Sequence, residues 1–164
     1  MKFNFLCEHG KSIIDLEEDR FQKADEEIRY LNPELANWLW SQRSISYERY
    51  WELAISFLRK TVWSDVKGKD MEDGTEVKTA RFHQCKDGAF RATVSNLKNK
   101  TGAVVVVLFH PEYRDFDFLY IPADKVRQHT NQNGNGFCFT YPRNAEPSGW
   151  WVPYRTSLRN IIKA

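Results

Sequence analysis

The sequence has no apolar run that could cross a membrane. The longest, Ala103 to Phe109, is far shorter than the roughly 18 residues that a spanning helix needs. The apolar stretch near the N-terminus, between Met1 and Glu8, is too short for a signal peptide. We therefore expect a cytoplasmic protein that does not associate with a membrane.

Cysteine is scarce and odd in number. Cys7, Cys85 and Cys138 do not have the spacing of a disulfide framework, which suits a reducing compartment. Two of them could be paired with a nearby histidine, in Cys7-x-His9 and His83-x-Cys85. The one-residue gaps differ from the usual zinc-ligand gaps of about two to four residues, so we do not expect structural zinc.

Acidic residues are almost missing from the end of the chain. From Lys125 onward there are six basic residues and one acidic residue, Glu146, whereas residues 1–40 hold five basic residues against nine acidic ones. The net charge of +2 conceals this asymmetry. A basic C-terminal portion with aromatic and amide side chains is typical of a polyanion-binding protein, although a solvated basic face has the same composition.

The chain contains enough apolar residues for a folded domain. Its 164 residues are 41% hydrophobic and 15% aromatic, which predicts a single domain. Apolar residues at helical spacing predict helices over 12–30, 33–41 and 46–60, with Ser46 as the N-cap of the third. In that third helix we expect a buried stripe of Tyr50, Leu53, Ala54, Phe57 and Leu58.

From Val62 onward the hydrophobic period changes to two. Strands are predicted near 64–69, 74–81, 89–96, 103–110, 116–121 and 137–141. The segment 103–110 is apolar on both faces, which indicates a central strand. We expect the first turn of a short helix at Pro122, and a loop over the Asn- and Gly-rich residues 130–136.

This order of elements predicts an α/β (α+β) domain. A central mixed β-sheet would be flanked by helices. The parts are a helical extension (1–45), a core (46–126) and an irregular basic aromatic tail (127–164).

The segment from Ser64 to Arg81 concentrates the candidate functional residues. It reads as a strand with Asp65, a turn at Asp73-Gly74, and a return strand with Glu76-Val77-Lys78. Because strand side chains alternate, Glu76 and Lys78 should share one face while Val77 points into the core. Two carboxylates and an ammonium would then converge, which suits a divalent cation.

Two other acids also precede Glu76. We place Asp73 in the turn and Asp70 too near the end of the hairpin to reach across, which favours Asp65. An ordinary solvated strand pair joined by an Asp-Gly turn has the same residues, so the surrounding elements decide the interpretation.

Those elements are a helix with an inward carboxylate, this hairpin and then a fully buried strand. Their order resembles the core of the PD-(D/E)xK nuclease superfamily, the restriction-endonuclease-like fold, over residues 46–126. Ser64 stands where the family motif has its proline. The resemblance implies Mg²⁺ or Mn²⁺ held by Asp65, Glu76 and the backbone carbonyl of Val77, with Lys78 beside the attacking water. Glu52, or Glu48 one turn earlier, would complete the site.

The resemblance implies a metal-dependent DNA endonuclease of the type II restriction kind, acting as a homodimer on double-stranded DNA. Base or phosphate recognition is expected from a set of amide and guanidinium side chains: Asn131, Gln132, Asn133, Arg143, Arg155 and Arg159. Other possibilities are a repair, resolvase or mobile-element nuclease on the same core, and a nucleic-acid-binding or protein-interaction module without activity.

Overall fold

Three helices open the fold. The computed structural model describes residues 13–42, 45–64, 70–98, 100–142 and 146–163. The helices are α1 (Ile13–Leu31), α2 (Pro33–Ser41) and α3 (Tyr47–Leu58), close to the predicted ranges. The side chains of Asn32 and Ser46 cap α2 and α3 by accepting hydrogen bonds from first-turn N–H groups. None of the helices in these ranges has the length and apolar character that a membrane span requires.

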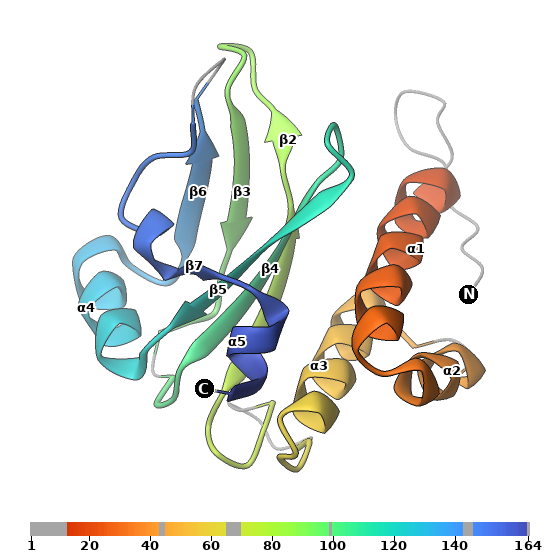
Figure 1. The fold of residues 1–164 in the computed structure, drawn as a ribbon. Helices are drawn as coiled ribbons and strands as arrows, with labels where there is room; N and C mark the ends of the chain where they lie inside the picture. Colours follow the sequence, from red (N-terminus) through yellow and green to blue (C-terminus); the bar gives the residue numbers. More distant parts are fainter. Residues whose placement is uncertain (1–12, 43–44, 65–69, 99, 143–145, 164) are drawn as a thin grey trace.

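The strands form two sheets (Figure 1). A four-stranded sheet has the order β1 (Glu76–Arg81), β4 (Val104–His110), β5 (Asp115–Ile121), β7 (Arg155–Thr156), and a three-stranded sheet has the order β2 (His83–Gln84), β3 (Phe90–Val94), β6 (Phe137–Tyr141). Strand β1 is parallel to β4, and the other pairs are antiparallel. The β2–β3 hairpin, rather than a helix, lies in the connection between the two parallel strands. The predicted mixed α+β class is confirmed.

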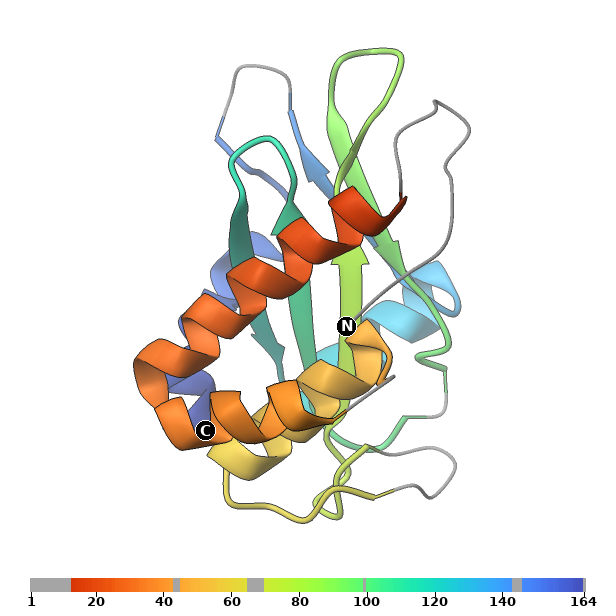
Figure 2. The same cartoon turned by 90° about the vertical axis from the view of Figure 1, so that its right-hand side faces the viewer.

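Strand β4 is buried along its whole length, as its sequence predicted. Val105 and Val107 belong to the hydrophobic core that includes buried residues of α1, α2 and α3. On the other side, Val104, Val106 and Leu108 belong to a second core with β6 and α4 (Ala123–Asn133). Figure 2 shows the three N-terminal helices crossing one face of the sheet. The two faces of one strand therefore organise both cores.

The C-terminal part is more regular than predicted. Besides β6, it contains a 3-10 turn, η1 (Val152–Tyr154), the short strand β7, and α5 (Leu158–Lys163). Trp151 enters the second core, and Leu158 and Ile161 enter the first. The prediction of an irregular tail is therefore wrong for residues 152–163, because their apolar side chains pack on the sheet.

The expected loop over 130–136 is also wrong in part. Helix α4 continues through Asn133 and ends at Gly134, whose φ of 86° favours glycine. Val126 and Thr130 lie on its buried side, and the Thr130 hydroxyl donates to the Val126 carbonyl at 2.9 Å. Packing of this side outweighs the low helix propensity of the asparagines.

Two further expectations concern α3 and the first strand. Of the predicted buried stripe of α3, Tyr50 and Ala54 are buried, whereas Phe57 is 57% exposed. Trp51 and Ile55 are buried as well. The predicted strand over 64–69 lies almost entirely outside the described residues. Its flanks pair in antiparallel fashion, through a bridge between Trp63 and Met71.

The start of β1 is fixed by close packing of two backbone segments. The Glu76 N–H donates to the Ala103 carbonyl at 3.0 Å. A Cβ added to Gly102 would lie 2.1 Å from the carbonyl oxygen of Gly74, so only glycine allows this approach. The turn before β1 and the loop before β4 are therefore held against each other.

We expect Gly102→Ala to destabilise the fold by about 1–3 kcal/mol, because the new methyl group meets backbone that cannot move aside. Urea unfolding would measure the change. Thr101→Ala, at the exposed neighbouring position, should stay within about 0.5 kcal/mol of the wild type. Equal stability of Gly102→Ala and wild type would contradict this close approach.

Candidate active site

Glu76 and Lys78 emerge side by side at the first strand of the mixed sheet. The Lys78 Nζ lies 3.4 Å from the Glu76 Oε1, while Val77 between them is 5% exposed and belongs to the helix-side core. This is the arrangement that the alternation of β1 predicted. Because β1 is the terminal strand of its sheet, the outer edge of its backbone faces away from β4.

Asp70 reaches that outer edge. Its Oδ2 accepts a hydrogen bond of 2.7 Å from the Val77 N–H. The chain before β1 brings it there, since the Ser64 N–H donates to the Asp70 carbonyl at 2.8 Å. The sequence argument that Asp70 sits too near the hairpin end is therefore wrong. Asp65, the acid that we favoured, lies outside the described residues.

The turn residue behaves as predicted. Asp73 Oδ1 accepts from the Thr75 N–H at 2.9 Å, and the next residue, Gly74, has a φ of 88°. Asp73 also lies 3.4 Å from Arg59. These contacts hold the Asp73 carboxylate in the turn. Of the two aspartates before Glu76 that the structure describes, Asp70 is therefore the one at the site.

A second lysine shares the Glu76 carboxylate. The Lys100 Nζ lies 3.1 Å from the Glu76 Oε1, the oxygen that Lys78 also contacts. Lys100 belongs to the loop before β4, far from the motif in sequence. Nothing in the local pattern around Lys100 signalled this role, because only the parallel pairing of β1 with β4 brings the loop to Glu76.

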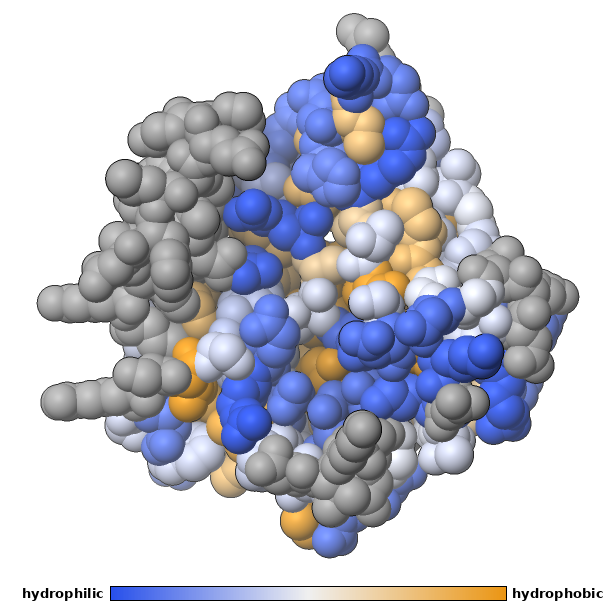
Figure 3. All heavy atoms as spheres, turned by 180° about the vertical axis from the view of Figure 1, so that it is seen from behind, coloured by the Kyte–Doolittle hydropathy of each residue, from blue (hydrophilic) through white to orange (hydrophobic). Residues whose placement is uncertain are grey.

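Helix α3 contributes two acids to an adjoining pocket. The pocket has a volume of about 250 Å³ and lies between α3, β1 and the end of β3. Figure 3, a view from behind, shows many hydrophilic side chains on this face, with apolar atoms exposed between them. The pocket is lined by Glu48, Glu52, Glu76, Val77, Lys78, Thr79, Thr93, Val94 and Ser95.

The carboxylates of the site influence one another. Burial is the main cause that raises the pKa of Glu52, and the charge of Asp70 raises it further. A hydrogen bond of 3.3 Å from the Trp63 indole N–H to Glu52 opposes this rise. Burial likewise raises the pKa of Asp70, and the charge of Glu76 raises it further. The hydrogen bond from the Val77 N–H and the charges of Lys78 and Lys100 lower it. Glu52 is thus electrostatically linked to Asp70 and Glu76.

The donor set fits a hard cation that also binds substrate. Within the described ranges, Glu76 Oε2 is buried without a hydrogen-bond partner, as an oxygen reserved for a ligand would be. The same ranges contain no group of three or more His, Cys, Asp or Glu side chains placed to hold a metal ion. Mg²⁺ is usually bound through one or two carboxylates together with substrate phosphates. Asp70 and Glu76 would supply these one or two carboxylates. They are too few to surround the ion with protein ligands alone.

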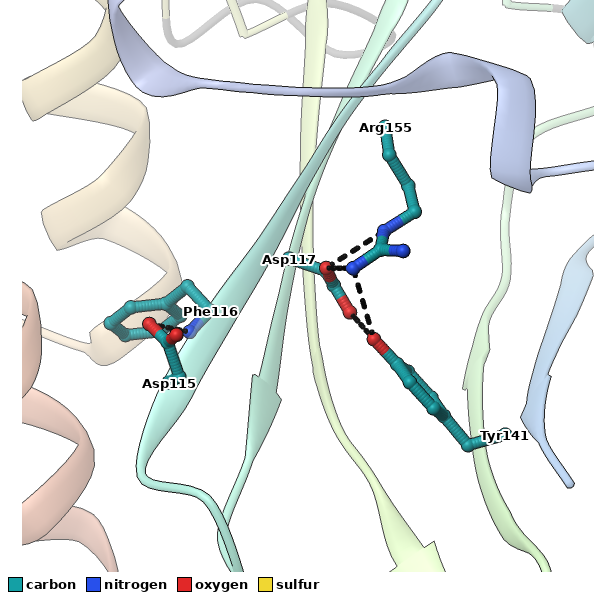
Figure 4. Close-up of polar contacts among 5 residues, drawn as sticks. All are labelled: Asp115, Phe116, Asp117, Tyr141 and Arg155. Atoms are coloured by element: carbon teal, nitrogen blue, oxygen red, sulfur yellow. Dashed lines mark hydrogen bonds and ion pairs between the residues drawn. The ribbon is translucent and has the colours of Figure 1, made fainter. Parts of the chain in front are cut away.

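Two of the predicted DNA-reading residues, Arg155 and Arg159, are not among the residues that line this pocket. Arg155 contacts Asp117 through Nε and Nη2, at 3.0 and 2.7 Å, and Tyr141 donates its hydroxyl to the same carboxylate (Figure 4). Arg159 lies over the ring of Tyr30, 5.4 Å from its centroid. Of the other four, Arg143 lies outside the described residues, and Asn131, Gln132 and Asn133 fall in the last turn of α4.

Comparisons with models of protein families, with curated proteins and with solved structures found no match for this chain. The chemistry of the site therefore rests on its own residues. Those are a buried carboxylate, a second carboxylate bound to a strand N–H, and two ammonium groups at one carboxylate oxygen.

We expect Glu52→Gln to stabilise the metal-free protein at pH 8 and to have little effect at pH 4. A carboxyl group whose pKa is higher in the folded than in the unfolded chain weakens folding as the pH rises through the folded pKa. Below the unfolded value, about 4.3 for glutamate, this cost is absent. Urea unfolding in EDTA at the two pH values would measure the difference.

Glu48→Gln, one turn earlier on the same helix, is the matched control. Because Glu48 is exposed, its replacement should change the free energy of unfolding by less than about 0.5 kcal/mol. If Glu52→Gln changed the free energy of unfolding equally at pH 4 and pH 8, its charge would not carry this cost.

Proposed function

We propose that this protein is a metal-dependent DNA endonuclease of the PD-(D/E)xK kind, which hydrolyses phosphodiester bonds. The observation that carries the proposal is the convergence of Asp70, Glu76 and Lys78 at the outer edge of β1, beside a pocket. Carboxylate ligands with an adjacent ammonium suit attack of water on a phosphodiester. Most charged strand pairs lie on open, solvated faces, whereas Glu76 is 6% exposed.

Asp70, Glu76 and the backbone carbonyl of Val77 would hold the cation, Mg²⁺ or Mn²⁺. The Val77 N–H donates to Asp70 at the outer edge of β1. Because the N–H and carbonyl of one strand residue point to the same edge, the Val77 carbonyl also faces the proposed cation. When bound, such an ion polarises the scissile phosphate and lowers the pKa of a coordinated water. If Asp65 also contributes, it does so from the segment just before Asp70.

Lys78 and Glu52 have complementary roles. The Lys78 ammonium, about one-fifth exposed, would orient the attacking water and stabilise charge on the phosphate oxygens. Glu52 faces the same pocket and is held by Trp63, so it would bind water at the edge of the site. Between the two acids of α3, the electrostatic link with Asp70 favours Glu52 over Glu48.

The substrate that we propose is double-stranded DNA, cut in the cytoplasm by a homodimer, because two strands require two sites when each chain has one. A type II restriction role is the leading version. Discrete fragments from long linear DNA would support it, whereas cleavage only at branched or mobile-element junctions would favour a repair, resolvase or mobile-element nuclease. DNA binding without cleavage would indicate a module without activity.

We expect Asp70→Asn, Glu76→Gln and Lys78→Ala each to reduce Mg²⁺-dependent cleavage of supercoiled plasmid at least about 100-fold, because each removes a ligand or charge needed in the transition state. DNA binding, measured by fluorescence anisotropy in EDTA, should survive in all three. Chelation of the metal should abolish cleavage by the wild type.

Asp87→Asn, at the exposed β2–β3 turn, is the control and should cleave at the wild-type rate. Asp65→Asn distinguishes the two candidate acids: a loss equal to that of Asp70→Asn would place both at the site. Full activity of Lys78→Ala or Glu76→Gln would rule out this active site.

A further inference from the structure

Lys100 is positioned by the packing of its loop against distant segments of the chain. Leu97 is fully buried, and its N–H donates to the Asn135 carbonyl at 2.9 Å, which anchors the start of the loop. At the other end, Gly102 packs against Gly74 so closely that no side chain fits between them. The loop between these anchors carries the Lys100 ammonium to Glu76.

Glu76 has two ammonium partners in a place that is largely removed from water. The side chains of Glu76, Lys100 and Lys78 are 7%, 14% and 21% exposed, so all three are largely removed from water. Burial of a charge without a partner is costly, and one ammonium already pairs with Glu76. The second ammonium, that of Lys78, lies 3.4 Å from the same Glu76 oxygen. One carboxylate oxygen thus has two ammonium partners before any metal ion binds.

A divalent cation bound to Glu76 would be repelled by these two ammonium groups. Of the two lysines, Lys100 is closer to Glu76 and lies outside the Glu-x-Lys pair. The proposed hydrolysis assigns a role to Lys78 and leaves the Lys100 ammonium without one.

We propose that Lys100 is the resident counter-ion of Glu76, which stabilises this carboxylate in the metal-free protein and competes with the divalent cation for it. The competition rests on the proposed metal-dependent function, whereas the pairing with Glu76 does not. Lys100 is thus a positioning residue that keeps metal affinity low in the absence of DNA.

The first experiment is a Mn²⁺ titration of the full chain without DNA, with free Mn²⁺ measured by electron paramagnetic resonance. Lys100→Met keeps the aliphatic stem and removes the charge, so Mn²⁺ should bind about tenfold more tightly than to the wild type. Lys98→Met removes an exposed charge from the same loop and should change Mn²⁺ affinity less than about twofold. Equal affinities of wild type and Lys100→Met, or equal gains in both variants, would overturn the competition.

The second experiment is a stability cycle in EDTA with Glu76→Gln, Lys100→Met and the double variant. If Lys100 acts as the counter-ion of Glu76, Lys100→Met should lower the melting temperature clearly in the wild type and much less in Glu76→Gln. Equal losses in both backgrounds would overturn the pairing. Failure of every variant to bind Mn²⁺, together with a non-additive cycle, would reject the metal-dependent function and leave the counter-ion role standing.

Discussion

The fold depends on the burial of β4 on both faces. A strand with apolar side chains on both faces must be covered on two sides, which accounts for the helices on one face and for α4, β6 and Trp151 on the other. The same strand takes β1 as a parallel partner and β5 as an antiparallel one. In this register Val77 enters the core, and the outer edge of β1 becomes the edge of the sheet that faces the pocket.

Burial also explains the composition of the site. Glu76 is almost fully buried, so its charge needs partners, and both lysines approach the same oxygen. The other oxygen lacks a hydrogen-bond partner among the described residues. The Asp70 carboxylate instead accepts a hydrogen bond from the Val77 N–H. A carboxylate with one side paired and the other open is well suited to accept a ligand.

The two sheets are joined away from the site by a polar cluster. Asp117 of β5 accepts from Tyr141 of β6 and from Arg155 of β7, so three strands from both sheets meet at one carboxylate (Figure 4). The pKa of the Tyr141 hydroxyl is raised by burial and by Asp117, so it remains a hydrogen-bond donor. This cluster gives Arg155 a structural role. The basic C-terminal residues therefore do not all serve to bind a polyanion.

By itself, the sequence determined the features that depend on near neighbours. Period-two alternation placed Glu76 beside Lys78, the caps set the starts of α2 and α3, and the valine run marked the central strand. Only the tertiary structure decided that Asp70 reaches Val77, that Lys100 shares Glu76, and that asparagine-rich residues continue α4. The reason is physical: strand and helix periodicity orient side chains locally, whereas contacts between distant segments depend on strand pairing and on which backbones can approach closely.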